Sequence, residues 1–271
     1  MITSPVSIAV APNGGRKTKA DHPAVPLNAK ELAETAARSL AAGASMIHAH
    51  VRAADGSHLL DADAYKDAIA AIRGAVGDRL VVQITSEALG KYSPAEQRAV
   101  VRGVKPEAVS LALRELVPDA AEERAFADLL GWLKQERVAP QIILYDAADA
   151  IRLADFRKRG LVPFDRLSVL FVLGRYTTGQ VSSPVDLLPF IASNAPAFEH
   201  WSVCAFGPQE IACVTTAALL GGHIRVGFEN NEFLPSGARA DSNEALVAAA
   251  HASVTSVGLA IATADELRAG W

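Results

Sequence analysis

The fold is decided by the stretch Ala44-Ser45-Met46-Ile47-His48-Ala49-His50-Val51-Arg52, which has the pattern of a buried strand that closes on two histidines. In a strand, residues two apart point to the same face, so His48 and His50 project side by side at its C-terminal end. Two imidazoles placed in this way can share one metal ion. The stretch therefore predicts a strand that carries part of a metal site.

A second stretch, Gly222-His223-Ile224-Arg225-Val226-Gly227-Phe228-Glu229-Asn230-Asn231, supplies a third candidate ligand. Glu229 follows a short apolar strand, at the point where a barrel strand passes into its loop. Two imidazoles, one carboxylate and an open position describe a catalytic zinc site, since a structural site is closed by four protein ligands. The same set of ligands is able to hold non-haem iron. The pattern predicts a metal and does not choose which one.

Outward from these two stretches, short apolar runs alternate with longer helical patterns along the whole chain. We expect eight strands, at residues 6–11, 46–51, 80–84, 108–113, 141–145, 167–173, 200–205 and 223–228. We expect eight helices, at residues 28–42, 62–76, 94–104, 121–136, 147–159, 184–192, 209–220 and 242–261.

Eight alternations in a chain of this size favour a (β/α)8 TIM barrel, class α/β, over an open doubly wound sheet. No glycine-rich dinucleotide motif follows the first strand, and no linker divides the chain, so one domain over residues 1–271 is expected. In a closed barrel, the second and eighth strands both neighbour the first. His48, His50 and Glu229 then converge at the C-terminal mouth, where such barrels keep their chemistry.

Composition excludes several classes of function. Half of the 271 residues are hydrophobic, 21% are charged and the net charge is -4, so no basic surface for nucleic acid is expected. The start of the chain has no basic segment followed by a long apolar one, and no apolar run is long enough for a membrane span. We expect a cytoplasmic protein in which Cys204 and Cys213 are small core residues.

Several motifs together resemble the β-keto acid cleavage enzyme family. They are Ile47-His48-Ala49-His50-Val51-Arg52, the loop Asp55-Gly56, the segment Trp201-Ser202-Val203 and, above all, Gly221-Gly222-His223-Ile224-Arg225-Val226-Gly227-Phe228-Glu229-Asn230-Asn231. The resemblance runs over nearly the whole chain.

The resemblance implies a zinc-dependent TIM barrel that forms a homo-oligomer, a dimer or a tetramer. It also implies a reaction in which a 3-oxo acid and acetyl-CoA give acetoacetate and a new acyl-CoA. The family's zinc ligands map onto His48, His50 and Glu229, and its catalytic arginine maps onto Arg225. Its hydroxyl residue after the third strand maps onto Thr85 or Ser86.

The chain departs from the family pattern beside the third ligand. Many members carry Glu-Asp-Asn where this chain has Glu229-Asn230-Asn231, so an amide replaces a carboxylate that handles a proton. An amide is no base near neutral pH. Either Glu87 or Glu115 takes the proton, or the reaction differs in detail.

The substrate pocket differs as well. After the first strand, where the aminated-substrate members carry a glutamate, this chain has Arg16, close to Asn13. A cation there disfavours an amine, so a 3-oxo acid whose distal end is acidic or neutral is expected. Arg114 and Glu115, after the fourth strand, also belong to the expected substrate-binding set, and their charges could compensate each other.

Two alternatives remain open on the sequence. One is a different metal-dependent C–C lyase or hydrolase on a TIM barrel, although hydrolases of the amidohydrolase type carry His-x-His on the first strand. The other is a non-catalytic protein that binds acyl-CoA or a small acid, which the amide at Asn230 keeps in consideration. The complete open metal site argues against the second.

Overall fold

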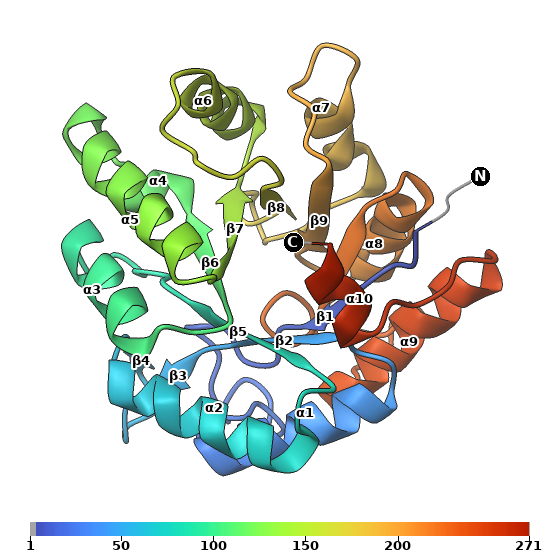
Figure 1. Cartoon of the computed structure of the whole chain (residues 1–271). Coiled ribbons are helices and arrows are strands. Elements are labelled where there is room, and N and C mark those ends of the chain that lie inside the picture. Colours follow the sequence, from blue (N-terminus) through green and yellow to red (C-terminus); the bar gives the residue numbers. More distant parts are fainter. Residues whose placement is uncertain (1–3, 271) are drawn as a thin grey trace.

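The computed structural model describes residues 4–270 of the chain, so residues 1–3 and 271, the ends of the predicted domain range, lie outside the described part. Eight parallel strands close into a barrel in the order β1-β10-β9-β8-β7-β6-β5-β2 (Figure 1). This confirms the predicted (β/α)8 barrel. The barrel strands are β1 (Ile8–Val10), β2 (Met46–Ala49), β5 (Val81–Thr85), β6 (Ala108–Ala112), β7 (Ala139–Leu144), β8 (Ser168–Leu173), β9 (His200–Ala205) and β10 (His223–Val226).

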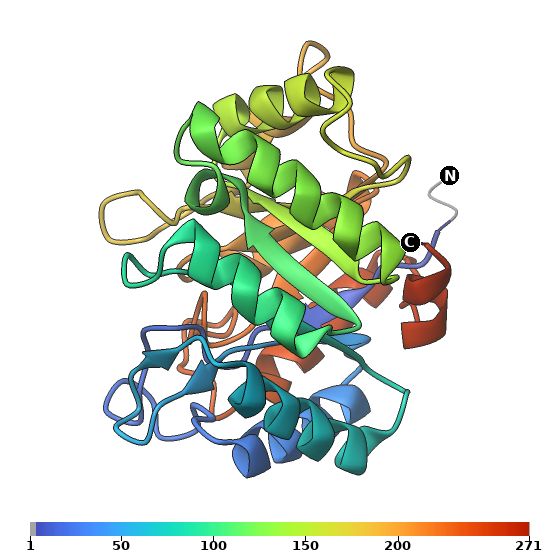
Figure 2. The ribbon, with the colours of Figure 1, turned by 60° about the vertical axis from the view of Figure 1, so that its left-hand side comes forward.

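Helices surround the strands, and the short helix α10 lies across one opening of the barrel (Figures 1 and 2). The helices are α1 (Ala29–Ala41), α2 (Ala62–Val76), α3 (Pro94–Val104), α4 (Leu113–Leu116), α5 (Glu123–Gln135), α6 (Ala147–Lys158), α7 (Leu188–Ile191), α8 (Glu210–Leu219), α9 (Asn243–Ser256) and α10 (Ala264–Ala269). Two 3-10 helices, η1 (Ala120–Glu122) and η2 (Pro184–Leu187), precede α5 and α7. Among the described residues, no helix is long and apolar enough to cross a membrane.

Three parts of the helical and strand pattern differ from expectation. A two-stranded hairpin, β3 (Val51–Arg52) and β4 (His58–Leu59), follows β2, so the second barrel strand is shorter than predicted. The predicted helix 242–261 ends at Ser256, because Gly258 has a φ of +84° and turns the chain towards α10. The predicted helix 184–192 is a 3-10 turn followed by a single helical turn.

The inside of the barrel is built in layers. One large apolar cluster, which includes Ile47 and Ile84, contains the strand residues that face the helices. Two smaller apolar clusters lie inside the barrel, one around Met46 near the N-terminal strand ends and one around Ile143 near the C-terminal ends. Between these two small clusters the inward side chains are polar: His48, Gln83, Ser110, Gln141, Ser202 and Arg225, each at most 7% exposed. Alternation along each strand separates the apolar outer face from this polar layer.

Candidate metal centre

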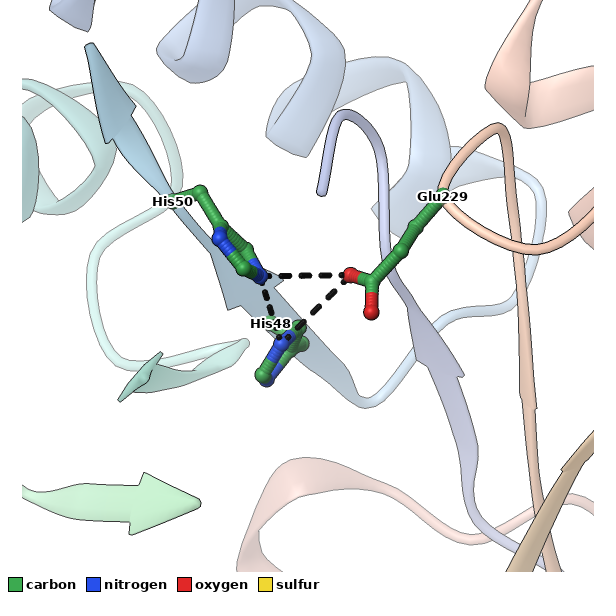
Figure 3. A group of neighbouring side chains, drawn as sticks. All are labelled: His48, His50 and Glu229. Carbon is green, nitrogen blue, oxygen red and sulfur yellow. Dashed lines mark hydrogen bonds and ion pairs between the residues drawn. The ribbon is translucent and has the colours of Figure 1, made fainter. Parts of the chain in front are cut away.

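The neighbours of β1 bring the two motifs together. β1 pairs with β2 on one side and with β10 on the other, as the barrel prediction required. β2 ends at Ala49, and His48 and His50 both face the barrel interior, each 1% exposed. Figure 3 shows their rings turned towards Glu229 from across β1.

Glu229 is carried by the tight loop after β10 and not by the strand itself. The strand ends at Val226, and Gly227 follows with a φ of +140°. The N–H of Glu229 donates to the carbonyl of Ala11 at 3.1 Å, which fixes the loop against the end of β1. Glycine is required at position 14 as well, because a Cβ there would lie 2.7 Å from Cγ of Glu229.

Three ligand atoms form a compact triangle. His48 Nε2 and His50 Nε2 are 3.2 Å apart, and Glu229 Oε2 lies 3.5 Å from the first and 3.4 Å from the second. A tetrahedral ion with bonds of about 2.0–2.1 Å separates its ligands by roughly 3.3 Å. Oε2 is buried and accepts no hydrogen bond from any described residue. The residues therefore fit a metal ion, and the predicted ligand set is the one group of three such side chains found in the described part of the chain.

The charge states of His48 and Glu229 suit a cation. Burial, opposed by Glu229 and reinforced by Arg225, lowers the pKa of the His48 imidazole to about 3. Burial raises the pKa of the Glu229 carboxyl, but Arg225 and the two imidazoles more than offset it and hold the pKa well below its usual value. Near neutral pH the site thus offers a neutral imidazole at His48 and an anionic carboxylate.

Arg225 lies directly beside the carboxylate. Its Nη2 donates to Glu229 Oε1 at 3.0 Å, so one carboxylate oxygen faces the arginine and the other faces the imidazoles. Nη2 also contacts Sγ of Cys204 at 3.2 Å. Its Nε and Nη1 are buried without a hydrogen-bond partner among the described residues. Arg225 therefore keeps two donors for a further group in the cavity.

The cavity at the metal ligands includes only part of the predicted catalytic set. It is lined by His48, His50, Thr85, Glu87, Ile143, Tyr145, Val172, Arg175, Phe206, Arg225 and Glu229. Thr85 reaches it, and its Oγ1 accepts from Ser110 and from the N–H of Glu87, both at 3.1 Å. Ser86 is fully buried, and its hydroxyl contacts the carbonyl of Ser110 at 3.4 Å. Of the two hydroxyls, the structure brings Thr85 to the cavity.

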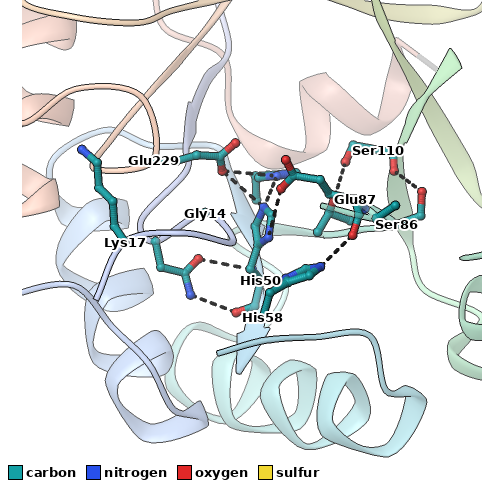
Figure 4. Close-up of polar contacts among 12 residues, drawn as sticks. Gly14, Lys17, His50, His58, Ser86, Glu87, Ser110 and Glu229 are labelled. Atoms are coloured by element: carbon teal, nitrogen blue, oxygen red, sulfur yellow. Dashed lines mark hydrogen bonds and ion pairs between the residues drawn. The ribbon is translucent and has the colours of Figure 1, made fainter. Parts of the chain in front are cut away.

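The two candidate proton carriers have different positions. Glu87 lines the cavity, and one of its oxygens lies 3.8 Å from His50 Nδ1 (Figure 4). Its other oxygen lies 3.8 Å from Arg175. Glu115 does not line it, and one of its oxygens accepts the N–H of Ala88 at 2.9 Å. Burial, with a contribution from Glu87, raises the pKa of Glu115 to about 7. Only Glu87 is placed to reach a molecule in the cavity directly.

Asn230, which the resemblance places where many members carry a carboxylate, is buried and does not line the cavity. Both ends of its side-chain amide lack a hydrogen-bond partner among the described residues. Its main-chain carbonyl accepts the N–H of Gly207 at 3.2 Å. The structure therefore gives Asn230 a place in the loop next to Glu229, and not a contact with Arg225.

A second cavity shares Glu87, Arg175, Phe206 and Glu229 with the metal cavity, and we call it the entrance. Two of the predicted substrate-binding residues, Asn13 and Arg16, line this entrance. Arg16 is exposed and lines the entrance together with Lys17 and Arg175. Asn13 is fully buried, and its amide donates to the carbonyls of His50 and Pro26, both at 2.9 Å. Both its donors are thus engaged with the main chain, so the structure makes Asn13 a support for the histidine strand.

Arg114 is also held elsewhere. It pairs with Asp146 and Asp149 at 2.6–2.8 Å and stacks against Tyr145 and Tyr176. No ion pair joins it to Glu115 in the described part of the chain. The ion-pair partners of Arg114 are instead two aspartates at the start of α6.

Three residues with clear tasks lie outside the predicted catalytic, substrate-binding and metal-ligand sets. Gln83 contacts the ring of His48, with its Oε1 at 2.8 Å from Nδ1. Arg52 donates to the carbonyls of Asn13, Gly14, Lys17 and Gly56, which joins the loop after β1 to the hairpin. His58, on β4, contacts the carbonyl of Glu87 at 2.7 Å through Nε2. A polar residue inside an apolar strand was the available signal for Gln83.

Comparison with known proteins shows the family to which the chain belongs. The model of the beta-keto acid cleavage enzyme family matches residues 5–270. The 3-keto-5-aminohexanoate cleavage enzyme of Fusobacterium nucleatum subsp. nucleatum is 30% identical over 96% of this chain and 95% of its own length. The 3-oxoadipate:acetyl-CoA acetyltransferase of Cupriavidus necator is 27% identical over 99% of this chain and 95% of its own length.

Among solved structures, the apo structure of ObcA has a similar fold. Its TM-score is 0.71 at 17% sequence identity, over 91% of this chain and 65% of the ObcA chain. At this identity the likeness concerns the fold alone. This chain spans about two thirds of the length of that protein.

Proposed function

Because this chain belongs to the beta-keto acid cleavage enzyme family, we propose that it condenses a 3-oxo acid with acetyl-CoA to give acetoacetate and a new acyl-CoA. The names of two relatives, a cleavage enzyme of a 3-keto acid and an acetyltransferase of 3-oxoadipate and acetyl-CoA, support this reaction. The observation that carries the proposal is the triangle of His48, His50 and Glu229, which opens on a cavity that also contains Arg225.

The proposed metal is zinc. Distances of 3.2, 3.4 and 3.5 Å between the ligand atoms are compatible with the roughly 3.3 Å of a tetrahedral ion. Three protein ligands leave the fourth position for substrate, as in catalytic zinc sites. When bound, zinc supplies Lewis-acid polarisation of the substrate's keto and carboxylate oxygens.

Arg225 and Thr85 would bind oxygens of the substrate. The free Nε and Nη1 donors of Arg225 are fixed next to Glu229, so they stabilise negative charge where it develops on a keto oxygen. Thr85 accepts two hydrogen bonds through Oγ1, which leaves its own hydroxyl proton to donate into the cavity. Preorganised donors of this kind need no rearrangement during the reaction.

Glu87 would take the proton that the condensation releases. In the proposed reaction a proton leaves C2 of the 3-oxo acid, and C2 bonds to the acetyl carbon of acetyl-CoA. The bond between the acetyl carbon and the sulfur of CoA breaks, and this sulfur then bonds to C3. The bond between C2 and C3 breaks, and C2 takes back a proton, so acetoacetate leaves and the thioester passes to the new acyl group. Glu87 lines the cavity, and Glu115 behind it has a pKa of about 7, which suits exchange of a proton.

The distal end of the substrate is proposed to be acidic or neutral. Arg16 lies at the entrance, and Arg175 lines both the entrance and the metal cavity, with its side chain 14% exposed. The carboxylate of Glu87, 3.8 Å away, is the one ion-pair partner of Arg175 among the described residues. A guanidinium with free donors favours a carboxylate over an amine.

The test is incubation of the zinc-loaded protein with acetyl-CoA and a panel of 3-oxo acids that are neutral, dicarboxylic or aminated at the distal end. Acetoacetate and the matching acyl-CoA are measured by mass spectrometry. We expect both products to appear in equal amounts, and to disappear in His48→Ala. The matched control is His251→Ala on α9, outside the described site, which should retain the activity.

Several results would contradict the proposal. Turnover that survives in His48→Ala would exclude the metal site from the reaction. Bound zinc without turnover on any member of a broad panel would favour another metal-dependent lyase or hydrolase, or a binding protein, with Asn230 as the reason. Preference for an aminated acid would contradict the proposed role of the two arginines.

A further inference from the structure

A line of polar side chains runs through the barrel interior behind His48. Nδ1 of His48 lies 2.8 Å from Oε1 of Gln83, whose Nε2 donates to Oε1 of Gln141 at 3.3 Å. Nε2 of Gln141 is in turn 3.2 Å from Oγ of Ser168 and 3.3 Å from Oγ of Ser202. Both glutamines are at most 5% exposed. The line connects one metal ligand on β2 with hydroxyls on β8 and β9.

The register of the strands makes this line possible. His48 is directly opposite Gln83 in the ladder between β2 and β5. β6 lies between β5 and β7, and it presents Ala108 opposite Gln83 and Ser110 opposite Gln141. Because both side chains on β6 are small, the two glutamines can meet across it inside the barrel.

The orientation of Gln83 decides which nitrogen of His48 carries the proton. A neutral imidazole has one N–H, and Nε2 must present its lone pair if it is to bind a metal. Nδ1 must then donate, and the carbonyl oxygen of Gln83 accepts this hydrogen. With the amide reversed, Nδ1 would accept, and the proton would move to Nε2, in the middle of the ligand triangle.

The contact with Gln141 supports that orientation. Its carbonyl oxygen accepts from the amide nitrogen of Gln83, so the oxygen of Gln83 is left for His48. We propose that Gln83, held by Gln141, is a positioning residue that keeps His48 in the tautomer and ring orientation required to bind the metal. This inference rests on the metal site of the proposed function, and it does not depend on the substrate or on the reaction.

A cavity on the other side of the two glutamines should limit the loss of metal affinity when Gln141 is replaced. Gln83 and Gln141 line a cavity of about 260 Å³ at the N-terminal ends of the strands, together with Ser7, His200 and His223 among others. This cavity has room for water, which is able to hydrogen-bond the amide of Gln83 when Gln141 is replaced. Loss of Gln141 should therefore weaken metal binding less than loss of Gln83.

The experiment measures zinc affinity by competition with a chromogenic chelator, without substrate. Gln83→Met keeps the length of the side chain and removes the acceptor, and we expect it to weaken zinc binding by about 10–100-fold. Gln83→Glu keeps an acceptor for the N–H of Nδ1, and we expect an affinity within about threefold of the original. Gln141→Met should lose roughly 3–10-fold.

The matched control is Gln97→Met. Gln97 is a fully buried glutamine on α3, outside the barrel, and its amide has no partner among the described residues. It should leave the affinity for zinc unchanged. ¹⁵N spectra of the metal-free protein give a second readout, because the His48 imidazole should be protonated at Nδ1 in the original chain and show a mixture of tautomers in Gln83→Met.

Three results would overturn the inference: no zinc binding by the original chain, equal affinity in Gln83→Met, or equal losses in Gln83→Met and Gln83→Glu. If Gln83→Met does not fold, the test rests on Gln83→Glu and Gln141→Met. Unchanged zinc affinity in Gln141→Met, together with a large loss of affinity in Gln83→Glu, would then contradict the inference. A protein that binds zinc in the expected order but shows no acyl transfer would contradict the proposed reaction alone.

Discussion

The two faces of each barrel strand carry opposite chemistry. On β2, Ile47 faces the helices within the large apolar cluster, while its neighbour His48 faces the barrel axis. On β5, Ile84 faces outward, and Gln83 and Thr85 face inward. All of these residues are at most 2% exposed. Burial therefore does not separate the two groups; the direction of the side chain does.

This difference teaches where stability and chemistry are located. Outward side chains stabilise the fold by removing apolar surface from water. Inward side chains in the polar layer instead depend on one another for hydrogen bonds, and a buried polar group without a partner costs free energy. Substitutions on the two faces should consequently change different measured quantities.

The largest expected loss of activity comes from replacing the metal-ligand carboxylate, Glu229. Glu229→Gln removes the anionic ligand and leaves Arg225 buried without its carboxylate partner at 3.0 Å. We expect kcat/KM for the proposed acyl transfer to fall by about 10³-fold or more, because the proposed metal and the orientation of Arg225 are lost together. Steady-state assays on the preferred 3-oxo acid check this, and a loss below tenfold would remove Glu229 from the metal site.

The next prediction compares substitutions of Ile47 and His48, which are adjacent on β2 and face opposite sides of the strand. Ile47→Ala should lower the free energy of unfolding by about 2–5 kcal/mol, because it deletes a fully buried side chain from the outer layer. The folded variant should keep its affinity for zinc within roughly threefold, since the inward register is unchanged. His48→Ala should do the opposite, abolishing zinc binding with a smaller change in the stability of the metal-free protein. Denaturant unfolding and chelator competition measure both quantities.

Glu210 does not follow this division, because it is a buried carboxyl group that lies outside the barrel, on α8. It accepts from the N–H of Gly227 and from the amide of Asn231, both at 3.2 Å. Burial raises its pKa to about 8, with only partial opposition from these hydrogen bonds. The unfolded chain therefore loses this proton near its ordinary pKa of about 4.5, while the folded chain keeps it up to about pH 8.

The consequence is a defined pH dependence. Between these two pKa values the folded state binds more protons than the unfolded state, so stability falls as the pH rises through the window. In Glu210→Gln this fall should be smaller by on the order of 4 kcal/mol, because the amide does not titrate. Unfolding at a series of pH values between 5 and 9 measures it, with the exposed Glu34→Gln as the control. Parallel curves for the original chain and Glu210→Gln would refute the assignment.

Much of the fold and the metal ligands could be predicted from local pattern. Alternating apolar runs and helical periods are visible in the sequence, and His48 and His50 fall two residues apart at a strand end. Glu229 could be added because β1 lies between β2 and β10 in any closed barrel of this order. Gly258 also indicates the end of α9 in the sequence. The prediction nevertheless extended the helix to residue 261, because apolar residues follow this glycine.

The rest depends on contacts that no local pattern contains. Asn13 and Arg52 follow strand ends, as substrate-binding residues do, yet their hydrogen bonds go to main-chain carbonyls of neighbouring loops. Arg114 is neutralised by aspartates from a different helix start. The link between Gln83 and Gln141 requires the register of three strands. Such partners are distant in sequence and are fixed only when the barrel closes.

The smallest expected effect concerns Arg175, and it compares two classes of substrate in the same cavity. This residue lines the metal cavity from the loop after β8, and its donors are free of hydrogen bonds to the described residues, with Glu87 3.8 Å away. Arg175→Met should lower kcat/KM for a dicarboxylic 3-oxo acid by about 10-fold and leave a neutral one within about threefold, because only the former has a distal charge to pair. Arg175→Lys, which keeps the charge, should recover part of the loss. The same variant at the exposed Arg16 should change the ratio less, since water screens its charge. Equal losses on both classes of substrate would show that Arg175 supports the fold of the mouth, and that the distal end of the substrate is bound by another group.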